Sequence, residues 1–222
     1  MNTVPRALLL DFGSVISVSV FERHRETEQI LGLPAGTLTW LGPLKPESDL
    51  LWQQMLRGEI SERDYWQQRA RETGERVGEH GWDMPRLLQR VRQTDPNAVV
   101  RPEIDALVHA ARVAGIHIGI LSNELELFYG RHFLERMDFL KDLDVIVDAT
   151  HTGILKPDPR AYQFAIDALR LPPAEILFVD DQFRNVAGAF NVGLQTQFFD
   201  LRDVPGNIAA VAARLGLPHR GT

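Results

Sequence analysis

The stretch Ala7-Leu-Leu-Leu-Asp11-Phe-Gly13-Ser14 runs through apolar residues without a break and then reaches an aspartate. Such an unbroken apolar run is typical of a parallel strand that is buried on both faces. We therefore predict a strand over Ala7–Asp11, followed by a tight turn at Gly13 and Ser14.

From about Pro102 onward, strand patterns alternate with helix patterns along the chain. The predicted strands cover 116–121, Val145–Val147, Ile176–Asp180 and Gln195–Phe199. The predicted helices cover Glu103–Ala114, Leu125–Met137, Pro159–Leu169, Arg184–Phe190 and Ile208–Leu215. Strands that alternate with helices form a parallel sheet with right-handed crossovers, so the predicted fold class is α/β.

The long segment between the first two strands has helical character instead. Its predicted helices cover Glu22–Leu31, Ser48–Met55, a segment that opens at Ser61, and Met84–Val91. Ser61 with Asp64 resembles a capping box. The tryptophans all fall in this segment, and we predict that they form its core rather than a binding platform: Trp40, Trp52, Trp66 and Trp82. Residues 17–99 are therefore predicted to be a helical domain, inserted into a core made of residues 1–16 and 100–222.

Composition excludes several classes of function. The 222 residues carry a net charge of −6, which leaves no positive field to attract nucleic acid. The absence of cysteine excludes disulfides, thiolate zinc sites and cysteine nucleophiles. No apolar stretch approaches the roughly 20 residues that span a bilayer, and the apolar run after Arg6 is too short for a signal peptide. We expect a cytoplasmic protein with neither a nucleic acid nor a membrane as partner.

Three later stretches place polar residues at or near strand ends: Ile-Leu-Ser122-Asn123, Leu-Lys156-Pro157 and Leu-Phe-Val-Asp180-Asp181. Ligands of parallel sheets bind beyond the carboxyl ends of the strands. Asp11, Ser122 and Asp180 all lie at such ends, so we expect them to converge on one site.

Asp11 is the candidate nucleophile, because attack by a carboxylate on phosphorus divides hydrolysis into two easier steps through an acyl phosphate. The alternative is a strand-end aspartate that caps the following turn. Lys156 lies in a loop stiffened by prolines, where its ammonium group could offset the charge of Asp11 and of a phosphoryl group. The alternative is an exposed surface lysine.

Phosphate donors are predicted at two places. Backbone amides at Gly13 and Ser14 could point at phosphate oxygens, although a turn glycine alone would explain the sequence. The Ser122 hydroxyl and the backbone amide of Asn123 could supply two more donors. Alternatively, Ser122 caps the helix predicted from Leu125.

A metal site is predicted beside them. Two adjacent carboxylates, Asp180 and Asp181, are costly at a strand end unless a cation offsets their charge. Magnesium suits ligand sets made of oxygen atoms, and Asp11 and the Gly13 carbonyl complete the predicted set. We assign Asp180 the direct contact, Asp181 an indirect one, and Asn185 a bracing role. The alternative is a helix N-terminus that attracts acidic residues.

These motifs, in this order, resemble those of the haloacid dehalogenase-like hydrolase superfamily, and the resemblance covers essentially the whole chain. It implies a Rossmann-like core with strand order 5-4-1-2-3, in which the Asp11 strand lies between those ending at Ser122 and Asp180. It also implies that the helical insert is a C1 cap, the part that usually selects the substrate.

One residue departs from the superfamily pattern. Its phosphatases usually carry a second aspartate, which protonates the leaving oxygen, where this chain has Gly13. Asp-Phe-Gly-Ser-Val-Ile is similar to a subgroup with Asp-x-Gly-Asn-Val, which includes sugar-1-phosphatases similar to bacterial glucose-1-phosphatase. The resemblance thus implies a substrate with a good leaving group, or another acid, for which Glu124 is one candidate.

Three hypotheses follow. The first is a magnesium-dependent phosphatase that acts on a small phosphorylated metabolite, such as a sugar phosphate, as a monomer or homodimer. The second is a reaction at carbon, such as dehalogenation. Dehalogenases of the superfamily usually have tyrosine in the place of Gly13 and need no metal, so Gly13 and the Asp180-Asp181 pair count against it. The third is a catalytically silent binding or regulatory protein.

Overall fold

The computed structural model describes residues 3–92 and 95–218. These residues divide into two compact units. One is a sheet unit, made of residues 3–18, 95–126 and 131–218, and the other is a helical unit, made of residues 19–92 and 127–130.

The sheet unit is built on a parallel sheet, which within the described residues has five strands in the order β3-β2-β1-β4-β5. The strands are β1 (Ala7–Leu10), β2 (His117–Ser122), β3 (Val145–Asp148), β4 (Ile176–Asp180) and β5 (Gln195–Phe198). The α/β class and the predicted order 5-4-1-2-3 are confirmed, because the two orders are the same sheet named from opposite edges. Every residue of β1 is buried, as expected of a central strand.

The register of the strands determines where the predicted site residues lie. Leu10 is the Cα partner of Ile120 on β2 and of Val179 on β4. The next residue, Asp11, therefore follows β1 between the ends of β2 and β4. Ser122 and Asp180 are the last residues of those two strands, so the three predicted residues share one edge of the sheet.

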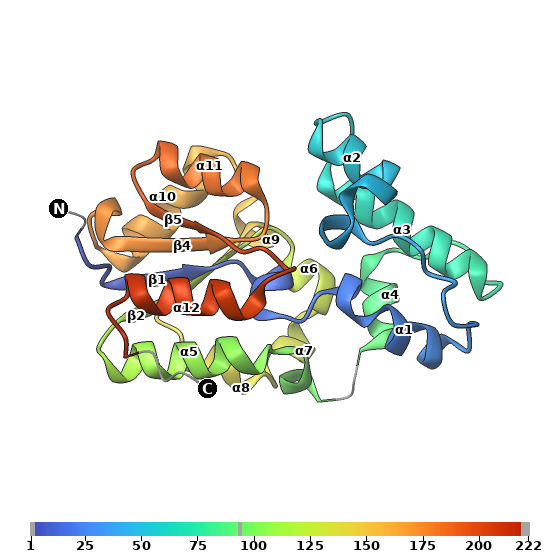
Figure 1. Cartoon of the computed structure of the whole chain (residues 1–222), viewed down its shortest axis with the longest axis horizontal. Coiled ribbons are helices and arrows are strands. Elements are labelled where there is room, and N and C mark those ends of the chain that lie inside the picture. The colour runs from blue at the N-terminus through green and yellow to red at the C-terminus, as the bar shows by residue number, and fades with distance from the viewer. Residues whose placement is uncertain (1–2, 93–94, 219–222) are drawn as a thin grey trace. The chain divides into compact units, whose positions relative to one another are not determined.

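Helices cover both faces of the sheet (Figure 1). On one face, α10 (Pro159–Leu169) packs on β2 and β3, and α11 (Phe183–Asn191) packs on β4 and β5. On the other face lie α5 (Pro102–Val113), which packs on β2, and α12 (Val204–Arg214), which packs on α5.

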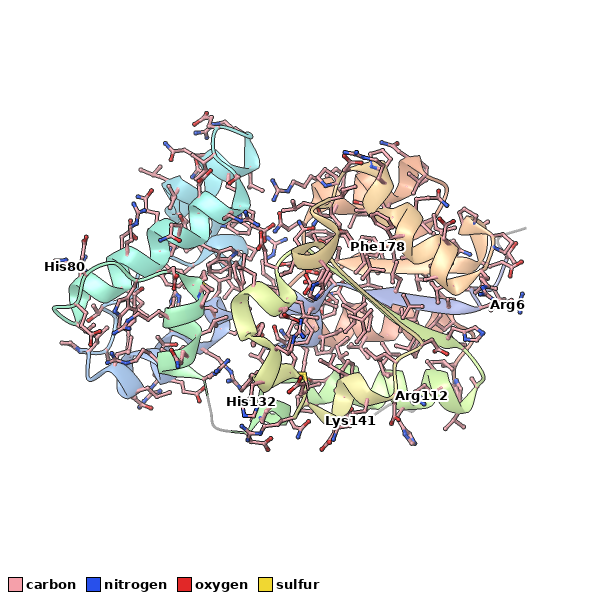
Figure 2. The ribbon with its side chains drawn as sticks, turned by 180° about the vertical axis from the view of Figure 1, so that it is seen from behind. Arg6, His80, Arg112, His132, Lys141 and Phe178 are labelled. Carbon is pink, nitrogen blue, oxygen red and sulfur yellow. The ribbon has the colours of Figure 1, made fainter. Side chains whose placement is uncertain are left out.

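One cluster of the core lies between the sheet and α10. Phe178 of β4 is fully buried, and its ring meets that of Tyr162 edge-on with centroids 5.7 Å apart. The Tyr162 hydroxyl donates to the carbonyl of Asn185 at 2.8 Å, which satisfies its one buried polar group. Figure 2 shows Phe178 inside the unit, whereas Arg6 and Arg112 lie at its periphery.

One predicted helix is wrong. Leu125–Met137 is not continuous but contains α6 (Leu125–Tyr129) and α7 (Arg131–Leu134), and α8 (Asp138–Lys141) follows. Gly130 separates the first two with φ at 78°, a left-handed conformation that an α-helix cannot include.

Two further segments differ from expectation. The last helix, α12, begins at Val204 rather than Ile208, because the Asp203 carboxylate caps it by accepting from the Gly206 amide at 3.0 Å. A short helix that the sequence pattern did not indicate, α9 (Ala149–Thr152), follows β3.

The helical unit contains the predicted helices, with bounds α1 (His24–Leu31), α2 (Leu50–Leu56), α3 (Glu62–Arg76) and α4 (Met84–Val91). The capping box that opens α3 is confirmed. The Ser61 hydroxyl accepts from the Asp64 amide at 3.1 Å, and the Asp64 carboxylate accepts from the Ser61 amide at 3.1 Å.

The tryptophans pack inside this unit, as predicted. Trp40, Trp52 and Trp82 are buried, and Trp66 packs against the cluster that contains Trp82. A Cβ atom added at Gly74 would lie 2.6 Å from the Trp82 ring, so only glycine fits there.

Across the described part of the chain, none of the helices combines the length and the apolar character that crossing a bilayer requires.

Candidate active site

Lys156 is the centre of the candidate site. Its Nζ atom lies 2.7 Å from Asp11 Oδ1 and 2.7 Å from Asp180 Oδ2, and its side chain is 2 % exposed. The alternative of an exposed surface lysine is therefore wrong. Burial lowers the pKa of Lys156, but Asp11 and then Asp180 raise it, and the net result is a pKa above its usual range. Lys156 is thus a buried ammonium ion that bridges two strand ends.

Asp180 is fully buried and held by its own loop. Its Oδ1 accepts from the backbone amide of Gln182 at 2.8 Å, and the Asn185 side chain donates to both carboxylate oxygens at 3.1 Å. These contacts fit the bracing role predicted for Asn185.

Asp181 joins the other two carboxylates. Asp11, Asp180 and Asp181 each offer an oxygen atom within 4.8 Å of the others. Asp11 makes no side-chain capping hydrogen bond to the following turn, so the predicted alternative of a simple cap has no support. Three acidic groups around one ammonium ion leave excess negative charge, and oxygen-only ligands suit a hard divalent cation. The donor set therefore fits a metal such as magnesium.

The turn after β1 has an unusual backbone. Ser14 is buried and adopts φ 64°, which is uncommon for a residue other than glycine. Its amide donates to the Ser17 hydroxyl at 3.3 Å, and its carbonyl accepts from Arg101 Nη2 at 3.1 Å. The side chains of Ser17 and Arg101 therefore hold the turn in which we predict phosphate donors.

Gly13 lies directly beside the candidate nucleophile. A Cβ atom built at Gly13 would lie 3.8 Å from Asp11 Oδ2, an ordinary contact distance, and its φ of −63° is open to any residue. Neither space nor conformation therefore demands glycine here.

Ser122 and Asn123 follow directly from β2. Ser122 is 6 % exposed at the strand end. The Asn123 side chain binds the backbone of Lys156 at both ends: Oδ1 accepts from its amide at 2.7 Å, and Nδ2 donates to its carbonyl at 3.2 Å. The structure thus brings Asn123 to the site through Lys156.

Asp148 makes capping contacts at the helix for which Ser122 is the predicted alternative cap. The amide of Glu126, in the first turn of α6, donates to Asp148 Oδ2 at 2.7 Å. Asp148 is the last residue of β3, and its other oxygen accepts from the Thr150 amide at 2.9 Å. A buried carboxylate from the neighbouring strand therefore caps the segment that follows Ser122.

Sequence patterns did not single out Asp148, Arg101 or Ser17. Asp148 shares with Asp11 and Asp180 one usable signal, an aspartate directly at the end of an apolar strand. Arg101 has no local signal, because its partner Ser14 lies 87 residues away.

Comparison with known proteins agrees with these features. The model of the family described as haloacid dehalogenase-like hydrolase matches residues 7–193. A phosphatase of Mycobacterium tuberculosis is 32% identical over 45% of this chain and 46% of its own length. An (S)-2-haloacid dehalogenase of a Pseudomonas species is 34% identical over 43% of this chain and 41% of its own. The chain thus spans less than half the length of either curated relative.

A solved structure shares the fold. The L-2-haloacid dehalogenase of Xanthobacter autotrophicus has a TM-score of 0.55 and 20% identity, over 86% of this chain and 76% of its own. A likeness at that identity is a likeness of fold alone. The family match, in contrast, extends over all the residues that the strand-end motifs contribute to the site, from Asp11 to Asp181.

Proposed function

The chain belongs to the haloacid dehalogenase-like hydrolase family, and from that premise we propose that it is a magnesium-dependent phosphatase for a small phosphorylated metabolite. The observation that carries the proposal is the buried Lys156 ammonium between Asp11 and Asp180. This arrangement combines a nucleophilic carboxylate, a cation to offset developing charge and a second carboxylate for a metal.

Asp11 forms a covalent intermediate in this proposal. A carboxylate oxygen of Asp11 attacks phosphorus, and the bond from phosphorus to the leaving oxygen breaks, with the electron pair departing on that oxygen. Water then attacks the acyl phosphate at phosphorus, which releases inorganic phosphate and restores Asp11. Lys156 holds Oδ1, so we assign the attack to Oδ2, the oxygen that faces the position of Gly13.

The metal ligands are drawn from the carboxylate cluster. Asp11, Asp180 and Asp181 would hold magnesium, with the Gly13 carbonyl as a further candidate. When bound, magnesium polarises the phosphoryl oxygens and offsets their charge. Gly13, Ser14, Ser122 and Asn123 are the proposed phosphate-binding residues.

Gly13 cannot supply a general acid, so the ease with which the leaving group departs must compensate for the missing proton donor. A positioned general acid is worth about 10²–10⁴ in rate, and glycine supplies none. We therefore infer a substrate whose leaving group departs readily, such as a sugar 1-phosphate, or a different acid. Glu124 is 9 % exposed directly after Asn123 and is the candidate acid.

Dehalogenation is the second candidate, because curated relatives carry that name. It needs the same nucleophile but makes no use of three converging carboxylates. Halide release from a 2-haloacid that continues in EDTA would favour it over phosphate hydrolysis.

Phosphate release from a panel of esters tests the proposal. The panel contains sugar 1-phosphates, sugar 6-phosphates and p-nitrophenyl phosphate, assayed with magnesium and with EDTA. We expect release that requires magnesium and is lost in Asp11→Asn. A folded protein that binds magnesium but hydrolyses no ester would favour the silent binding protein.

A further inference from the structure

Two exposed phenylalanines of the sheet unit pack against each other, and we call them the aromatic pair. Phe183 is 72 % exposed and Phe198 is 37 % exposed. Their rings meet at an angle of 66° with centroids 6.5 Å apart. Paired rings that remain in contact with water contribute little to the core, so their position calls for another explanation.

The aromatic pair lies at the edge of the sheet where the carboxylates converge. Phe198 is the last residue of β5 and the register partner of Asp180 on β4. Phe183 is the first residue of α11, two residues after Asp181, and α11 packs on β4 and β5 (Figure 1). The backbone of Phe198 is thus the immediate neighbour of the Asp180 backbone, and Phe183 begins the helix that follows Asp181.

The chemistry differs between these two neighbouring groups of side chains. Asp11, Asp180 and Asp181 offer oxygen atoms within 4.8 Å of one another. The two rings offer apolar faces and no hydrogen-bonding groups. A ligand that spans both needs an anionic, metal-seeking end and an apolar end.

We propose that the aromatic pair binds the leaving group of the substrate, and that this group is an aryl group rather than a polyhydroxylated one. The inference rests on the proposed phosphatase function. An aryl phosphate satisfies both demands of the site, because its leaving oxygen departs readily without the acid missing at Gly13 and its ring can stack on phenylalanine.

A matched control lies on the same helix. Phe190 is 69 % exposed and follows Phe183 by seven residues, so it occupies the same face of α11 about two turns away from the carboxylates. Substitution of Phe190 therefore removes a ring about as exposed as that of Phe183, but one that lies outside the proposed binding site.

The kinetic test compares 2-naphthyl phosphate with phenyl phosphate, because both leave as aryloxides of similar acidity and differ in the area of the aromatic ring. We expect the wild-type protein to prefer the naphthyl ester. Phe183→Ala and Phe198→Ala should each reduce the ratio of the two kcat/KM values about tenfold, the scale of one lost ring contact. Phe183→Tyr should keep most of the preference, and Phe190→Ala should keep all of it.

A binding test separates this inference from the proposed function. The non-hydrolysable 2-phenylethylphosphonate and ethylphosphonate are titrated calorimetrically with magnesium present. Tighter binding of the phenylethyl compound, lost in Phe183→Ala, supports the aromatic pair even if no ester is hydrolysed, in which case the proposed function alone fails. Equal affinities for the two phosphonates would overturn the inference.

Sedimentation tests the alternative that a second copy of the chain, rather than a substrate, covers the aromatic pair. If the wild-type protein is a dimer that Phe183→Ala and Phe190→Ala both dissociate, the rings cover an interface between copies and the inference is overturned. An unchanged mass in both variants supports it.

Discussion

The side-chain amide of Asn123 holds the backbone of Lys156 at two points, accepting from its N–H at 2.7 Å and donating to its carbonyl at 3.2 Å. Lys156 in turn bridges Asp11 and Asp180. The end of β2 thus sets the position of the ammonium group through one amide.

We predict that Asn123→Asp lowers kcat about tenfold or more, since a carboxylate cannot donate to the Lys156 carbonyl and small displacements of reacting groups are costly. Asn97→Asp is a control, because Asn97 is a partly exposed asparagine remote in sequence from the site motifs. Steady-state phosphate release measures both. An Asn123→Asp enzyme with wild-type kcat would show that Lys156 does not depend on this amide.

Replacement of Lys156 by methionine should destabilise the protein as well as inactivate it. The variant leaves the buried Asp180 carboxylate without its cation, and breaking such a pair costs about 3–5 kcal/mol. Lys141 is a suitable control, because its side chain is 60% exposed and pairs only with Asp138 among the contacts described. Urea unfolding compares the two variants. Equal midpoints for Lys156→Met and Lys141→Met would contradict the structural role assigned to Lys156.

Gly13→Asp should gain activity toward esters with poor leaving groups. The Cβ has room beside Asp11 Oδ2, and a protonated carboxyl at this position could supply the missing proton. We expect an increase of roughly tenfold or more for an alkyl phosphate and little change for p-nitrophenyl phosphate. Gly13→Asn has the same shape without the acid and should gain nothing. Equal rates in the two variants would show that an acid is not what the site lacks.

The helical unit should lose stability in mild acid because of His24. Burial lowers the pKa of His24 to about 4; Glu28 and Asp49 act against this, and Arg69 adds to it. Since the folded-state pKa lies below the unfolded value of about 6.5, the unfolded chain binds more protons between these two values. Stability is therefore full above pH 6.5 and falls as the pH drops toward 4, by about 2 kcal/mol.

The variant His24→Leu tests this dependence. It should flatten the fall in unfolding free energy between pH 6.5 and 4, whereas His80→Leu, at an exposed position in the same unit, should leave the slope unchanged. Urea titrations at several pH values give the slope. If His24→Leu retains the wild-type slope, the acid sensitivity has another origin.

The sheet could be predicted from sequence because each of its strands and crossover helices has a recognisable local pattern. Each strand is an apolar run, and each crossover contains a helix, so order and direction follow from general rules and the resemblance. The break at Gly130 could not be predicted in the same way, because an isolated glycine inside a helical pattern is often tolerated.

The site was predictable to the extent that its residues end strands. Asp11, Ser122 and Asp180 follow from that rule, and Lys156 from its loop. The supporting contacts depend on tertiary structure: Asn123 meets Lys156 across 33 residues, and Arg101 meets Ser14 across 87. No local pattern reports which side chain will satisfy a distant backbone group.

Trapping the phosphoryl group on Asp11 would test the proposed covalent mechanism directly. The protein is mixed with magnesium and a phosphate ester that it hydrolyses, and the reaction is quenched in acid within the first turnover. The protein is then digested, and its peptides are analysed by mass spectrometry. We predict that the peptide containing Asp11 gains the mass of one phosphoryl group, and that the same peptide of Asp11→Asn gains none. Phosphate release without any phosphorylated Asp11, or a phosphorylated residue elsewhere, would contradict it.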